Sequence, residues 1–120
     1  MPGTPNGPTT GLAAVEWNME ADEQNTAAMW DCHVLRLGIN ENYLADSLMF
    51  HLTPTGSACI KNVWLWTADH DLDSNNMNQV SVYVAGGMLV ESVKPTCLYS
   101  TGSEHAVFYQ YEFFAAMIQT

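Results

Sequence analysis

Basic residues are scarce in this chain of 120 residues. Thirteen Asp and Glu stand against three cations, Arg36, Lys61 and Lys94, which gives a formal net charge of −10. Phosphate backbones need clusters of Lys and Arg, so the composition excludes a nucleic-acid partner, and it equally argues against an anionic membrane surface. An acidic, aromatic-rich chain suits a neutral polysaccharide. The alternative is that the acidity serves only solubility.

Long apolar runs are absent as well. No stretch approaches the ~20 apolar residues that a membrane-spanning helix requires. Residues 1–10 are dominated by Pro, Gly, Thr and Asn, and they lack the basic start and apolar run of a signal peptide. If the protein is secreted, we therefore expect its signal to lie upstream of this chain.

Cysteine is sparse, and its spacing is uninformative. Cys32, Cys59 and Cys97 are odd in number, so at least one of them lacks a partner within the chain. No C-x-x-C spacing occurs, which argues against a zinc ribbon or a thioredoxin-like site. Isolated buried thiols are the interpretation we favour, and one disulfide is the alternative that the sequence leaves open.

Short β-type segments separated by turn signals make up most of the chain. The Pro- and Gly-rich residues 1–11 predict a linker or tail. The pattern that follows predicts all-β structure, as a sandwich, barrel or solenoid. We expect Gly86-Gly87 to break one strand and residues 100–103 to form a turn. Strands are expected at 12–17, 47–52, 58–67, 79–85, 88–93, 96–99 and 106–114.

Two polar clusters are candidates for chemistry. The first, Asp69-His70-Asp71-Leu72-Asp73, resembles the start of an EF-hand loop, but the sixth position is Ser74 and the twelfth is Val80. A surface loop is the interpretation we favour there. The second, Ser103-Glu104-His105, is expected in a turn, where a carboxylate beside an imidazole can transfer protons. Adjacent residues of a strand point to opposite faces, so adjacency alone does not make them a pair.

Other side chains carry weaker signals. Glu91 is a lone carboxylate in an expected strand, and we predict that it faces solvent. Seven aromatic residues could stack on sugar rings, although packing between strands is the more common role of such residues. These residues are Trp64, Trp66, Tyr83, Tyr99, Phe108, Tyr109 and Tyr111.

Several segments in order resemble fungal glycoside hydrolase family 55, the exo-β-1,3-glucanases. The longest are WLWTADHDLD, residues 64–73, and SEHAVFYQY, residues 103–111. The resemblance runs from about Gly11 to Thr120. The further segments are 15–17, 29–34, 47–54, 80–84, 89–92 and 99–102.

The resemblance implies an all-β chain, a partial right-handed parallel β-helix of the pectin-lyase-like kind, with residues 12–120 forming an incomplete domain. It also implies an inverting hydrolysis that releases glucose from β-1,3-glucan of the laminarin type. The family is secreted and uses a companion N-terminal β-helix domain. Neither a cofactor nor a metal is expected.

The resemblance assigns a catalytic role to Glu104, which matches the glutamate thought to position or activate water. It implies that Tyr99, His105, Tyr109 and Gln110 bind substrate. The family's general acid looks like a glutamate that would follow residues 117–120, beyond this chain.

Departures from the family point to a catalytically incomplete segment. Cys97 and Ser100 stand where the family shows Trp and Gly, and residues that the family carries after Arg36 and between Tyr111 and Met117 are missing. We expect a fragment that lacks activity. An active enzyme, or a non-catalytic β-glucan-binding module with Tyr99 and Tyr109 as a platform, are the alternatives.

Overall fold

The computed structural model describes residues 13–23, 27–37, 42–70, 79, 82–114 and 116, and these form two parallel β-sheets. The described residues contain no helix, and so none that could cross a membrane. The strands are β1 (Ala13–Trp17), β2 (Ala28–Leu37), β3 (Asn42–Leu52), β4 (Ala58–Ala68), β5 (Val82–Val90), β6 (Thr96–Tyr99), β7 (Gly102–Glu104) and β8 (Tyr109–Phe113).

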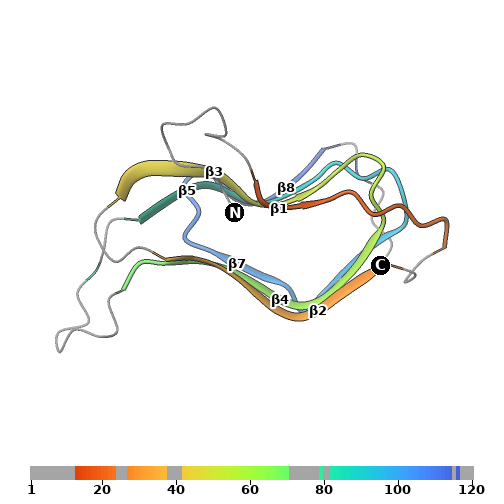
Figure 1. Ribbon diagram of the computed structural model, residues 1–120, viewed down its shortest axis with the longest axis horizontal. Helices are drawn as coiled ribbons and strands as arrows, with labels where there is room; N and C mark the ends of the chain where they lie inside the picture. Colours follow the sequence, from red (N-terminus) through yellow and green to blue (C-terminus); the bar gives the residue numbers. More distant parts are fainter. Residues whose placement is uncertain are drawn as a thin grey trace.

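The chain alternates between the two sheets. Sheet A has the order β1-β3-β5-β8, and sheet B has the order β2-β4-β6, with β7 also paired to β4. The two sheets lie one above the other, with turns at both sides (Figure 1). Parallel neighbours need a long crossover connection, and here each crossover contains a strand of the opposite sheet instead of a helix. Each circuit of the chain therefore adds a strand to each sheet, and the last circuit adds two, β6 and β7, to sheet B.

The core lies between the two sheets. Inward and outward residues alternate on each side of Asn62 in β4, and the inward Ile60, Val63 and Leu65 are almost completely buried. Sheet A contributes Phe50 and Met88, which are register partners in β3 and β5. Register is fixed because a slip by one residue would turn these side chains to solvent.

The alternation in sheet B is interrupted at one level by a bend. Asp31, Asn62 and Ser100 occupy successive circuits, and each has a positive φ, of 57°, 52° and 51°. Short polar residues tolerate this left-handed conformation better than most. The Asn62 side-chain amide donates to the Asp31 carboxylate at 2.7 Å, which ties two of the three positions together.

The bend resets which residues face outward. Strict alternation would turn Trp64 inward, because it lies three residues after the outward Lys61. The left-handed residue Asn62 takes up the extra position, so Val63 is buried and Trp64 returns to the outer face. Sheet B therefore shows outward side chains on both sides of the bend.

The all-β prediction is confirmed, but several local expectations were wrong. No strand was expected at β2, and β3 begins earlier than the expected strand at 47–52. Gly86 and Gly87 lie inside β5 and do not break it. A Cβ on Gly86 would lie 2.5 Å from the Tyr109 ring, and one on Gly87 would collide with the Ser103 hydroxyl. These glycines permit close packing between circuits.

Residues 100–103 also differ from the expected turn. Ser100 bends the chain, but Gly102 and Ser103 already belong to β7, which pairs with β4. Residues 1–11, 71–78 and 117–120 lie outside the described residues, so the expected linker and most of the expected polar loop are untested.

The structure pairs two of the three cysteines. Cys59 and Cys97 are register partners in β4 and β6 and form a disulfide, with Cα atoms 4.6 Å apart. Cys32 is a free thiol whose Sγ donates to the Trp30 carbonyl at 3.2 Å. The interpretation as isolated thiols is therefore wrong for Cys59 and Cys97, because partner choice depends on a register that spacing alone does not reveal.

Glu91 is not the lone solvent-facing carboxylate that the sequence predicts. It follows β5, and its Oε2 lies 2.7 Å from His51 Nε2 of β3. Both side chains are partly buried, at 29% and 22% exposure. The contact links two successive circuits on sheet A.

Ser100 is a site where glycine should stabilise the fold. A left-handed conformation costs a residue with a Cβ about 1–2 kcal/mol, and glycine avoids this cost while adding entropy to the unfolded chain. We expect Ser100→Gly to raise the free energy of unfolding by about 0.5–1 kcal/mol, measured by urea denaturation. Val93→Gly, at an exposed position without positive φ, is the control and should destabilise. Equal losses in both variants would contradict the assigned conformation.

Candidate functional site

The outer face of sheet B carries an aromatic cluster. Trp64 and Trp66 alternate with buried residues along β4, and their rings stack with centroids 4.9 Å apart and planes 9° apart. His33 of β2, the register partner of Trp64, meets it edge-on at 5.6 Å. Both tryptophans are partly buried, and neither belongs to the core cluster between the sheets.

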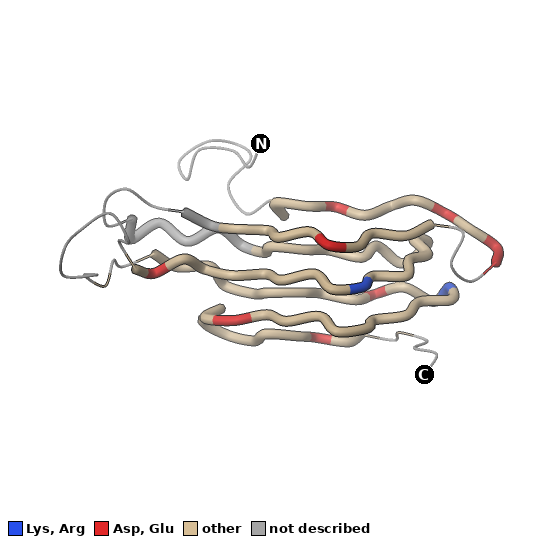
Figure 2. Tube along the Cα trace, turned by 90° about the horizontal axis from the view of Figure 1, so that it is seen from below, with Lys and Arg blue, Asp and Glu red and all other residues tan. Residues whose placement is uncertain are grey.

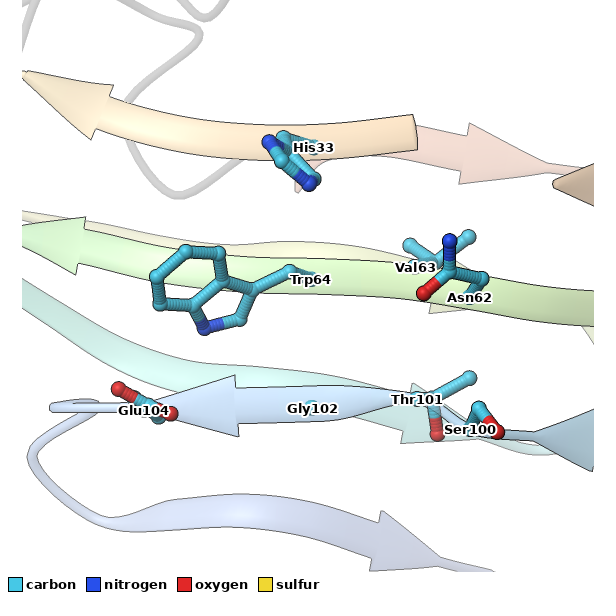
Figure 3. Close-up of a pocket in the computed structure, with 8 residues that line it drawn as sticks. All are labelled: His33, Asn62, Val63, Trp64, Ser100, Thr101, Gly102 and Glu104. Carbon is cyan, nitrogen blue, oxygen red and sulfur yellow. The ribbon is translucent and has the colours of Figure 1, made fainter. Parts of the chain in front are cut away.

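A shallow groove of about 440 Å³ lies over this part of the sheet. Trp64 lies between His33 of β2 and Glu104 of β7, three side chains from neighbouring strands (Figure 3). Gly102 is the register partner of Trp64, and a Cβ there would lie 3.4 Å from Trp64 Cδ1. The groove is lined by His33, Asn62, Val63, Trp64, Ser100, Thr101, Gly102 and Glu104.

Trp64 also leaves a hydrogen-bond donor unused. Its Nε1 is buried and has no partner among the described residues. In the close-up this nitrogen lies on the side of the ring that faces the strand of Gly102 and Glu104 (Figure 3). A buried, unpaired donor costs free energy.

Glu104 is exposed at the end of β7, opposite its register partner Trp66. The next residue, His105, has a positive φ of 64° and turns back toward the end of β4. There its Nδ1 lies 3.4 Å from Asp69 Oδ1, which also lies 2.7 Å from His70 Nδ1. The two polar clusters that the sequence singles out therefore meet at one edge of sheet B.

The Asp69 carboxylate is the bridge between those clusters. Its side chain is 15% exposed, whereas His70 and His105 are 46% and 49% exposed. Sequence reasoning missed this contact because it depends on the parallel pairing of β4 with β7. Within the described part of the chain, no three His, Cys, Asp or Glu side chains are arranged to hold a metal ion.

Tyr99, expected to bind substrate, lies on the same face as Glu104 but beyond the bend. It is 63% exposed, and Lys61 Nζ lies 5.6 Å from the centre of its ring. This distance is within the range of a cation–π contact. Tyr99 directly precedes Ser100, which lines the groove.

Tyr109 and Gln110 occupy a different place, at β8 of sheet A. The Tyr109 ring lies over Gly86, its register partner in β5. The Gln110 side chain accepts from the Ala106 amide at 3.2 Å and donates to the Ala106 carbonyl at 2.9 Å. These two residues organise the last circuit, and they do not line the groove that holds Glu104.

The surroundings of Tyr109 also keep it neutral. Burial raises the pKa of its hydroxyl above the ordinary value of 10.0, and the negative charge of Glu112 and a hydrogen bond with it act in the same direction. Tyr109 is therefore a hydrogen-bond donor at neutral pH.

Among the described residues, Asp and Glu positions occur on several strands and turns along the Cα trace (Figure 2). The fold and the groove together define an all-β protein of stacked parallel strands with an aromatic and acidic groove on one outer face. Ring faces beside a carboxylate and hydroxyl groups suit a neutral, hydroxyl-rich ligand better than an anion.

Comparison with known proteins finds relatives that are named either as effectors or as glucan glucosidases. The chain is 42% identical over 141 residues to the "Non-secreted LysM effector LysM15" of Penicillium expansum. It is 32% identical over 144 residues to a "Probable glucan endo-1,3-beta-glucosidase" of Arthroderma benhamiae, and 29% identical over 142 residues to a "Glucan 1,3-beta-glucosidase" of Cochliobolus carbonum. No protein-family profile and no solved structure matches the chain.

These matches cover most of this chain and little of each relative. They span 98%, 98% and 95% of the chain but 10%, 16% and 17% of the relatives' own lengths. The aligned regions run over 141 to 144 residues, whereas the chain has 120, so the relatives carry insertions within the matched region. The relation to glucan 1,3-β-glucosidase-like proteins thus rests on sequence along nearly the whole chain.

Proposed function

We propose that this chain binds β-1,3-glucan in the groove on sheet B and carries one carboxylate, Glu104, of an inverting exo-β-1,3-glucanase site. The observation that carries the proposal is that Glu104 and Trp64 line the same groove on the outer face of sheet B, where Glu104 is the register partner of Trp66. An indole face packs against the C–H face of a pyranose ring, while a carboxylate accepts bonds from sugar hydroxyls. The names of two relatives support a glucan as the ligand.

Hydrolysis with inversion needs two carboxyl groups about 6.5–9.5 Å apart, one as general acid and one to activate water. Glu104 is the one carboxylate among the described residues that line the groove. In this proposal Glu104 activates or positions the water, and the general acid is contributed from outside this chain. The isolated chain should therefore bind glucan without cleaving it.

The proposed setting is a longer parallel β-helix. Each circuit adds parallel strands to both sheets, and the outer strands β1 and β8 of sheet A each pair on one side within the described chain. Further circuits and a companion N-terminal domain in a longer protein would cover these edges. The disulfide supports secretion, because disulfides persist in oxidising compartments.

A non-catalytic β-glucan-binding module is the second candidate. It is favoured by the single groove carboxylate and by the relative that is named an effector and not a glucosidase. Both candidates require the same groove to bind glucan, and they differ only in whether a longer protein completes the catalysis.

The test is retention by laminarin in affinity gel electrophoresis. We expect Trp64→Ala to weaken laminarin binding at least about tenfold, which is about 1.4 kcal/mol, because it removes the ring that forms the groove floor. Tyr83→Ala is the matched control, since Tyr83 is 40% exposed in β5 of the other sheet. Glu104→Gln, which keeps shape and removes charge, should also weaken binding.

Two results would overturn the proposal. One is a wild-type chain that laminarin does not retain. The other is equal retention of wild type and Trp64→Ala when both variants are folded, as judged by a cooperative thermal melt.

A further inference from the structure

A second outward row of side chains lies across sheet B, beyond the bend. Trp30, Lys61 and Tyr99 are register partners in β2, β4 and β6, so they form one line across three strands. Their inward neighbours Met29, Ile60 and Leu98 belong to or pack against the core. We refer to Trp30, Lys61 and Tyr99 as the outer row.

Two aromatic side chains of the outer row are exposed to solvent. Trp30 is 62% exposed and Tyr99 is 63% exposed, among the most exposed aromatic side chains of the described chain. Lys61, which lies between them in the register, has its Nζ 5.6 Å from the Tyr99 ring centre. Exposed rings that share a line with a hydrogen-bond donor are typical of a binding surface and not of a core.

The outer row is continuous with the groove. Lys61 and Tyr99 immediately precede Asn62 and Ser100, and both of these line the groove at the bend. Because each left-handed residue absorbs one position, the outward side chains on the two sides of the bend belong to one face. The hydrogen bond from Asn62 to Asp31 holds that junction in place.

We infer that the outer row is a second subsite for the same neutral glucan, so that the chain binds an oligosaccharide that crosses the bend. This inference rests on the proposed function. Adjacent strands are about 4.8 Å apart, so Trp30 and Tyr99 are separated by about 10 Å, which is room for about two sugar rings. In the outer row, Trp30 and Tyr99 offer aromatic rings to a sugar, and the Lys61 ammonium offers a hydrogen-bond donor. The single positive charge does not require an anionic ligand.

The test compares laminaribiose with laminarihexaose by isothermal titration calorimetry. Trp30→Ala and Tyr99→Ala should each raise the dissociation constant for laminarihexaose about three- to tenfold and leave that for laminaribiose unchanged, because the short sugar fits the groove alone. Trp64→Ala should weaken both sugars. Phe113→Ala, at a 48% exposed ring of sheet A, is the control and should alter neither.

The outcomes separate the two claims. If Trp64→Ala weakens both sugars while Trp30→Ala and Tyr99→Ala change neither, the proposed function stands and the outer-row subsite falls. If wild-type chain binds laminarihexaose but not laminaribiose, the groove is not a separate subsite and the inference falls. If Trp30→Ala abolishes self-association in sedimentation velocity and leaves glucan affinity unchanged, the row is a protein interface. If the wild-type chain binds neither laminaribiose nor laminarihexaose, both the proposed function and the outer-row subsite are wrong.

Discussion

Loss of the Cys59–Cys97 disulfide is expected to lower the free energy of unfolding by about 4 kcal/mol, because the bond closes a loop with a sequence separation of 38. The reduced unfolded chain regains the entropy that this loop removes. The effect is large relative to the total stability of a small domain, about 5–15 kcal/mol. It should be measured by urea denaturation of wild-type protein with and without reductant.

The disulfide holds a short strand of sheet B in place. It joins β6, a strand of only four residues, to β4 in the middle of sheet B. The chain passes from β6 through Ser100 into β7, which carries Glu104. Reduction should therefore loosen the groove before it unfolds sheet A.

A double variant, Cys59→Ser with Cys97→Ser, is the control for the reductant itself. It should unfold at the same urea concentration as reduced wild type, and reductant should not shift it further. Cys32, a free thiol, stays unchanged in both proteins. Identical curves for oxidised and reduced wild type would contradict a role for the disulfide in stability.

Phe50→Ala is expected to cost about 3–5 kcal/mol of unfolding free energy. Phe50 is fully buried near the end of β3, between Val15 of β1 and Met88 of β5 in the register. Its ring stacks on Trp17 at 6.4 Å. Truncation would remove buried area and leave a cavity that two parallel sheets cannot close by moving together, since their ladders fix their positions.

Phe114→Ala is the matched control for this substitution. The same atoms are removed at a position that is 64% exposed, so the change in stability should stay within about 0.5 kcal/mol. Thermal melts followed by circular dichroism measure both variants. Equal effects at the two positions would contradict the assigned core and the strand register that defines it.

The sequence predicted the strand-rich character because its signals were local. In the strand β4, Ile60, Val63 and Leu65 lie among outward side chains, and residues 53–56 form a strong turn signal before it. The strand β2 was missed because its outward positions include Trp30 and Leu35, so no clear alternation of polar and apolar residues marks it. The Gly86-Gly87 pair was misjudged because its role depends on partners from the next circuit.

The sequence predicted only part of the candidate site, because contacts between circuits depend on strand pairing that local signals do not reveal. Glu104 and Tyr99 were singled out by resemblance, and the structure places both on the outer face of sheet B. The contact of His105 with Asp69 joins residues that are far apart in the chain and needs the pairing of β4 with β7. Tyr109 and Gln110 remain predicted substrate contacts, although they lie at β8 and outside the groove lining.

The most direct test of the glucan-binding groove uses the four tryptophan indole N–H signals in a ¹H–¹⁵N correlation spectrum. Trp17 is the internal reference, because it is buried and its Nε1 donates to the Ser57 carbonyl at 3.0 Å. On titration with laminarihexaose, the Trp64 signal should shift progressively and saturate while the Trp17 signal stays in place. A Trp64 signal that does not move at saturating sugar, or a uniform shift of all four signals, would contradict the account.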